Sequence, residues 1–242
     1  MKKFTSPFIF IKRSLDLFFK KENLLFFIQV YLPVGFLAVL MTLFALVPSL
    51  NQIFNPATGN SQVVVFPLID KYVGSSIAVL VTVLTVLVNV FVNLAGILAI
   101  KKVVSGEKLN VRATYKETFS KYRTFLALSV VVWLIHTAGL ILLLFPFVIV
   151  TTWFIFSKFI IVEKRLGVKM SLVESKRLVK GDFWKILLRM VVFYIFFYLT
   201  QLLLVSFPYG VGYVTHSLFG ALFLLPYFLF YKEVSSAKTI DL

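Results

Sequence analysis

The sequence has no cysteine and few charged residues, which make up 14% of its 242 residues. The absence of cysteine excludes disulfides, thiolate metal sites and cysteine nucleophiles. Soluble domains contain about a quarter charged residues, so this low fraction, beside 60% hydrophobic residues, excludes an ordinary soluble domain. Acidic residues are the scarcer charged class, with ten against 25 Lys and Arg, and the formal net charge is +15.

Recognisable catalytic motifs are absent as well. The sequence has no Gly-x-Ser-x-Gly, no His-Glu-x-x-His, no glycine-rich phosphate loop and no paired aspartates within an apolar run. Ser206 or Ser217 could be paired with His216, but neither serine has the glycine neighbours of an exposed nucleophile. We therefore expect no enzymatic activity, no cofactor and no metal site.

Long apolar runs occupy more than half of the chain. A helix needs roughly 20 mostly apolar residues to cross about 30 Å of hydrocarbon, so these runs predict membrane-spanning helices. Six of them can be delimited, at residues 24–47, 73–100, 125–143, 147–161, 183–205 and 211–231.

Two connections between these runs are short. Pro146 disfavours helix at the residue before it, so we expect a tight turn at 144–146. A second turn is expected at 206–210, which contains a proline and a glycine. The fourth run is short for a full crossing, and we expect Lys158 to extend its ammonium toward the inner interface.

The basic residues lie on alternate sides of the apolar runs. Segments on one side carry 22 Lys and Arg, and segments on the other side carry one. Because cytoplasmic loops carry the Lys/Arg excess, we expect a multi-pass protein of the cell membrane with both termini cytoplasmic. The cations flank the membrane, where each gains about 1 kcal/mol at an anionic leaflet, so we interpret them as contacts to lipid and not to nucleic acid. The long basic segment before the first run predicts an anchor and not a cleaved signal peptide.

Three basic segments combine charged and apolar residues at helical spacing. They cover residues 7–21, 109–122 and 168–180, and a basic amphipathic helix beside a membrane lies in the interface plane. Ser6 and Pro7 predict the start of the first, by serine capping and proline in the first turn. The sequence thus predicts an all-α, single integral membrane domain over 1–242, built as three hairpins that each follow an interfacial helix.

One stretch resembles a known motif. In residues 159–185, a helix ends at Glu163, Gly167 forms a turn, and a short helix ends in Ser-x-x-Leu-x-Lys-Gly at 175–181 before the aromatic Trp184. This pattern is similar to one in uncharacterised bacterial six-helix membrane proteins, among them the YciC-type inner-membrane proteins and the membrane domain of some glycerophosphoryl diester phosphodiesterases. The resemblance implies fold and location only, since the phosphodiesterase catalytic domain is absent here.

Charged residues near the predicted inner interface are the first site candidates. Arg189 and Lys185 lie near the inner start of the fifth span, one turn apart and on one face with Asp182. Lys185 is expected to extend to the interface, and Arg189 either binds a lipid phosphate or pairs with Glu163, with Asp182 as the second candidate. Further cations expected at anionic headgroups are Lys12, Arg13, Lys176, Arg177 and Lys180.

Polar residues within the spans are the second group of candidates. Asn89 and Asn93 share a face of the second span, and His136 and His216 lie in the third and sixth spans. Such residues pack membrane helices by hydrogen bonding more often than they bind substrates, and the two histidines have no nearby carboxylate for a proton relay or metal pair.

Two functions remain open at this level. The first is a non-catalytic envelope module that holds anionic lipid, a partner membrane protein or a second copy of the chain. The second is a small-molecule transporter or channel subunit, in which Asn89, Asn93, His136 and Arg189 would line a path. An uninterrupted apolar interior would favour the first, and a water-filled cavity reaching His136 from one side would favour the second.

Overall fold

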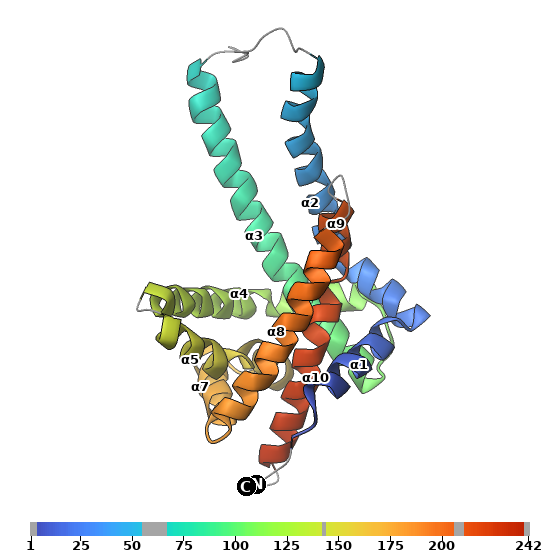
Figure 1. Ribbon diagram of the computed structural model, residues 1–242, viewed down its shortest axis with the longest axis vertical. Coiled ribbons are helices and arrows are strands. Elements are labelled where there is room, and N and C mark those ends of the chain that lie inside the picture. The colour runs from blue at the N-terminus through green and yellow to red at the C-terminus, as the bar shows by residue number, and fades with distance from the viewer. Residues whose placement is uncertain (1–3, 55–66, 142–143, 206–210, 240–242) are drawn as a thin grey trace.

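The computed structural model describes residues 4–54, 67–141, 144–205 and 211–239, which are almost entirely helical (Figure 1). The predicted all-α fold is therefore confirmed. The helices are α1 (Pro7–Phe18), α2 (Lys21–Phe54), α3 (Pro67–Ser105), α4 (Val111–Ile141), α5 (Leu144–Phe154), α6 (Ser157–Lys164), α7 (Val168–Val179), α8 (Phe183–Val205), α9 (Val211–Leu218) and α10 (Gly220–Thr239).

Five stretches of the described chain are long and apolar enough to cross a membrane, so this is a multi-pass helical membrane protein. The sixth predicted span, 211–231, is not among them. The helix there is interrupted at Phe219, and α10 continues past the apolar residues to Thr239. The five stretches are Lys21–Leu40, Val79–Ser105, Val111–Ile141, Phe145–Lys164 and Phe183–Leu203.

Two of the three predicted interfacial helices are separate helices, and the third is part of a longer one. Segments 7–21 and 168–180 form the separate helices α1 and α7, as predicted, but 109–122 is continuous with the following span in α4. No glycine or proline divides α4 near residue 122, whereas Gly181 with a φ of +91° separates α7 from α8. Pro7 begins α1 as expected, but the Ser6 side chain makes no capping hydrogen bond.

The fourth span, predicted as one helix over 147–161, is divided into α5 and α6 at Ile155 and Phe156. Ser175 of α7 lies at this break. Its Oγ accepts a hydrogen bond from the Phe156 N–H at 3.2 Å and donates one to the Trp153 carbonyl at 2.7 Å. The serine therefore satisfies two backbone groups that the interrupted helix leaves without intrahelical partners.

The turn predicted at 144–146 is misplaced, because these residues belong to the first turn of α5. Proline fits the first turn of a helix because its missing N–H has no intrahelical partner there. Gly139 of α4 lets α5 approach closely, since an added Cβ would lie 3.2 Å from the Phe147 Cα. The predicted turn at 206–210 lies outside the described residues.

The core is built mainly from the second helix of each predicted hairpin. Residues 94–100 of α3, 159–162 of α6 and most of 221–234 of α10 are buried. Tyr31 of α2 packs against Gly96 and Gly220, where any side chain would overlap its ring. Close approach of α2, α3 and α10 therefore depends on these two glycines.

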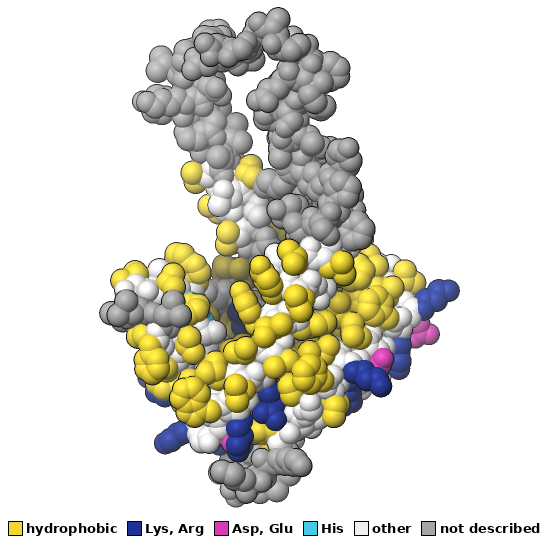
Figure 2. Space-filling view, viewed as in Figure 1, with side chains coloured by type: hydrophobic (Ala, Val, Ile, Leu, Met, Phe, Trp, Pro, Cys, Tyr) yellow, Lys and Arg dark blue, Asp and Glu magenta, His cyan; other side chains and the backbone are white. Residues whose placement is uncertain are grey.

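The outward apolar surface comes from α2, α4 and α8 and from the part of α3 that precedes its buried end. Large exposed apolar side chains on these helices include Phe36, Leu80, Trp133 and Leu188. Figure 2 shows these surfaces as a broad hydrophobic belt, with basic side chains gathered along its lower and right-hand edges. In Figure 1, α4 lies at a large angle to the α2–α3 pair.

Candidate functional site

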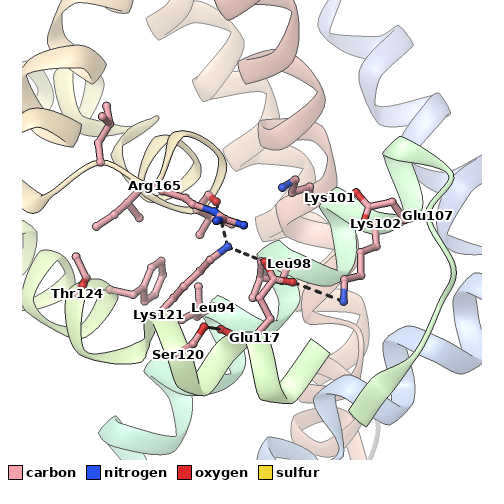
Figure 3. Close-up of a pocket in the computed structure, with 14 residues that line it drawn as sticks. Leu94, Leu98, Lys101, Lys102, Glu107, Glu117, Ser120, Lys121, Thr124 and Arg165 are labelled. Atoms are coloured by element: carbon pink, nitrogen blue, oxygen red, sulfur yellow. Dashed lines mark hydrogen bonds and ion pairs between the residues drawn. The ribbon is translucent and has the colours of Figure 1, made fainter. Parts of the chain in front are cut away.

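A pocket of about 570 Å³ lies where the end of α3, the first turns of α4 and the end of α6 meet (Figure 3). Sites for small molecules are typically about 300–1,000 Å³. Its floor is apolar and mostly buried, formed by Leu94, Leu98, Phe125, Ile161, Val162 and Leu166. Its rim is polar and mostly exposed or half-buried, formed by Lys101, Lys102, Glu107, Glu117, Ser120, Lys121, Thr124 and Arg165.

Glu117 of α4 organises part of this rim. Its carboxylate accepts a hydrogen bond from the Lys121 Nζ at 2.6 Å and lies 3.7 Å from the Lys102 Nζ. Lys102 is only 8% exposed and also donates to the Thr114 Oγ1 at 3.1 Å. The buried lysine is thus paired and hydrogen-bonded, as a buried charge requires.

Lys101 and Arg165 complete the rim without such partners. Among the described residues, neither cation has a carboxylate within ion-pair distance. Arg165 also ends α6 in the left-handed conformation, with a φ of +54° that costs a non-glycine residue about 1–2 kcal/mol. Figure 3 shows its guanidinium beside the Lys121 ammonium at the pocket.

The pocket therefore combines an excess of positive charge with an apolar floor. Four cations face two carboxylates around it, and one of those carboxylates is already held by two lysines. Two cations remain for an anion, and a guanidinium binds phosphate in a bidentate manner. The arrangement suits an anionic group attached to an apolar body.

Arg189 faces the protein and has partners, but not the predicted ones. Its guanidinium donates to the backbone carbonyls of Phe4 at 3.0 Å, Thr5 at 3.2 Å and Lys185 at 3.0 Å. It also lies over the rings of Phe4 and Phe230, at 5.2 and 5.8 Å from their centroids. The prediction of a Glu163 or Asp182 partner is wrong, because the guanidinium is hydrogen-bonded to the backbone of the N-terminal segment instead.

The two carboxylates predicted for Arg189 pair with lysines instead. Glu163 accepts a hydrogen bond from Lys232 of α10. Asp182 lies 2.9 Å from the Lys185 Nζ, as the predicted ion pair requires, and 3.8 Å from the Lys238 Nζ. These pairs join α6 to α10 and the start of α8 to the end of α10.

The basic cluster of α7 is partly engaged within the protein. The Lys176 Nζ lies 4.2 Å from the centroid of the Trp153 ring. Arg177 and Lys164 both hydrogen-bond Glu174, and these contacts, Arg177 first, lower the pKa of Glu174 to about 2. All five cations predicted at anionic headgroups are nevertheless exposed, namely Lys12, Arg13, Lys176, Arg177 and Lys180.

The predicted intramembrane polar residues do not meet in one place. Asn89 is exposed and donates to the Thr85 carbonyl of its own helix, while the buried Oδ1 of Asn93 has no partner among the described residues. His136 lines a separate cavity, far along α4 from the basic pocket. The side chain of His216, on α9, lies outside the described residues.

Nothing in the sequence alone places Lys101, Lys121 and Arg165 together, and none of them is a predicted site residue. They come from three segments whose meeting depends on tertiary packing. One local signal exists, because Glu117 and Lys121 are four residues apart on one helix. Comparisons with family models, curated proteins and solved structures give no match to this chain.

Proposed function

We propose that this protein is a non-catalytic membrane protein that binds the headgroup of an anionic phospholipid in the pocket between α3, α4 and α6. The observation that carries the proposal is the pair of cations without carboxylate partners, Lys101 and Arg165, above a buried apolar floor. The cations would hold the phosphate, and the floor would contact the start of the acyl chains. A water-soluble anion would leave that apolar floor unused.

We further propose that the chain crosses the membrane six times, with α9 and α10 together forming the last crossing. This arrangement puts both termini and the basic pocket on the cytoplasmic side. Support comes from the basic residues at the inner ends of the described helices and from the positive-inside bias. An anionic inner leaflet would then lie at the level of the pocket.

We also propose membership of the bacterial six-helix proteins that residues 159–185 resemble. Two residues of the motif have clear roles that support this proposal. Ser175 bridges the break between α5 and α6, and Gly181 adopts a positive φ between α7 and α8.

The lipid site is tested by removing its unpaired cations. We expect Lys101→Gln combined with Arg165→Gln to weaken phosphatidylglycerol binding about tenfold or more, since a charge-assisted hydrogen bond contributes about 1.5–3 kcal/mol. The measurement is native mass spectrometry of the purified protein titrated with phosphatidylglycerol, with phosphatidylcholine as the uncharged comparison.

The matched control removes the same charge elsewhere. Lys12→Gln combined with Arg13→Gln changes two exposed cations of α1 and should weaken binding only slightly, with the difference vanishing in high salt. Equal losses in both double variants would mean general attraction to a basic surface. Unchanged binding in the pocket variant would refute the site.

The transporter or channel alternative has one observation in its favour, a cavity that reaches His136. The four residues expected to line a path do not support it together, since Asn89 is on the exposed surface and Arg189 is held by the N-terminal segment. Transport is therefore the second candidate function.

A further inference from the structure

A second cavity, of about 220 Å³, lies among α3, α4, the α5–α6 break and α10. Most of its wall is apolar and comes from Ile97, Val132, Phe154, Ile155, Phe159 and Leu224. Four polar side chains also line it, and they belong to His136, Thr151, Lys158 and Tyr227. This cavity shares no lining residue with the basic pocket.

Lys158 is the distinctive member of this set. The sequence predicts that it extends toward the inner interface, but its side chain lines the cavity beside His136. Among the described residues it has no hydrogen-bond acceptor and no carboxylate within ion-pair distance. A charge within a membrane-spanning stretch is costly and usually has a partner or a function.

Two further polar groups in the cavity have unused hydrogen-bonding capacity. The Thr151 Oγ1 is buried and has no partner among the described residues. The His136 Nδ1 lies 2.6 Å from the Val132 carbonyl and must donate to it, because that oxygen only accepts. In the neutral ring the Nε2 is then left as an acceptor.

The mouth of the cavity opens onto an apolar surface. Ile97 and Phe159 are buried, whereas several other lining residues on α4, α5 and α6 keep partial exposure. The neighbouring surface of α4 and α5 carries Trp133, Leu134 and Phe145, each more than half exposed. Figure 2 shows a hollow on this face, between the α4–α5 side and α8, within the hydrophobic belt. A ligand would enter from the bilayer.

We propose that this cavity binds the carboxylate end of a long-chain fatty acid. The Lys158 ammonium pairs with the carboxylate, and the Thr151 hydroxyl donates a second hydrogen bond to it. The apolar wall contacts the first methylene groups, and the rest of the chain extends through the mouth into lipid. One unpaired cation matches one carboxylate, and the cavity has less than half the volume of the phospholipid pocket.

The test is oleate binding to the whole protein in nanodiscs of zwitterionic phospholipid, read both as bound radiolabel and as a rise in melting temperature. Lys158→Met should weaken oleate binding at least about tenfold and abolish the ligand-dependent rise, which depends on ligand concentration relative to Kd. The ligand-free variant should melt no lower than the natural protein, since the change removes a charge without a partner. If Lys158 had a purely structural role, the ligand-free variant would melt at a lower temperature than the natural protein.

Controls separate this cavity from binding elsewhere on the protein. Lys176→Met removes a cation outside the cavity and should keep full oleate binding. Lys101→Gln combined with Arg165→Gln removes the two cations of the phospholipid pocket and should also keep it. A failure of the phospholipid site can therefore be told apart from a failure of the fatty-acid site. Oleyl alcohol, which has no charge, should bind weakly. The proposal is overturned if Lys158→Met binds oleate normally, if oleyl alcohol binds as well as oleate, or if phosphatidylglycerol displaces oleate from the cavity.

Discussion

Replacing Ser175 with alanine is expected to lower the melting temperature by roughly 5 °C or more. Its Oγ is the partner of the Phe156 N–H and the Trp153 carbonyl at the α5–α6 break. Each buried backbone group left unpaired costs about 1–3 kcal/mol. For a chain of this size, 1 kcal/mol corresponds to about 2–4 °C. The measurement is thermal unfolding in detergent, in which unfolding is detected as the loss of the monodisperse peak.

Ser14 provides a matched control for this change. Like Ser175 it is fully buried in a short basic helix, here α1, but its Oγ has no partner among the described residues. Ser14→Ala should therefore leave the melting temperature unchanged or raise it slightly, because an unpaired hydroxyl is removed. Equal melting temperatures for the two alanine variants would show that Ser175 does not hold the break.

Replacing Arg189 with leucine is expected to cost about 3 kcal/mol or more and to release the N-terminal segment. The side chain donates three hydrogen bonds to backbone carbonyls, two of them in Phe4 and Thr5. Hydrogen bonds from charged groups contribute about 1.5–3 kcal/mol each. Thr5 would keep only its two bonds to Glu233, from the backbone N–H and the hydroxyl. Thermal unfolding and faster protease cleavage before α1 measure the two effects.

Two variants test the geometry of this contact. Arg189→Lys should recover less than half of the loss, because an ammonium cannot reproduce the planar fork that reaches two successive carbonyls. Lys185→Leu, one turn away, should cost less than about 1 kcal/mol, because it removes a partly exposed ion pair. Full rescue by lysine would mean that only the charge matters at position 189.

The sequence is sufficient to predict the fold class because apolar runs and flanking basic residues are local signals. It is insufficient at the helix breaks. The break at Ile155 and Phe156 has neither glycine nor proline. The Phe156 N–H that it leaves free is bonded by Ser175, a residue 19 positions later in the chain. The interruption at Phe219 likewise adjoins Gly220, which packs against Tyr31 of α2. Tertiary contacts decide both positions.

The candidate sites are harder to predict than the fold. Arg189 has partners, as expected, but a sequence pattern favours a side-chain carboxylate over the backbone carbonyls of Phe4 and Thr5. In the sequence, Lys101 and Arg165 are flanking charges that nothing local distinguishes from their neighbours. The packing of α3 against α4 and α6 places them at one pocket.

The orientation of the charged end is the central claim, because both the phospholipid pocket and the six crossings depend on it. The chain has no cysteine, so one introduced cysteine reports one position. Labelling with a membrane-impermeant maleimide would compare cysteines at Lys12, Gly59 and Ser236. We predict labelling of the Gly59 position from outside intact cells, and of the Lys12 and Ser236 positions only in inverted vesicles. Labelling of all three from the same side would contradict this orientation.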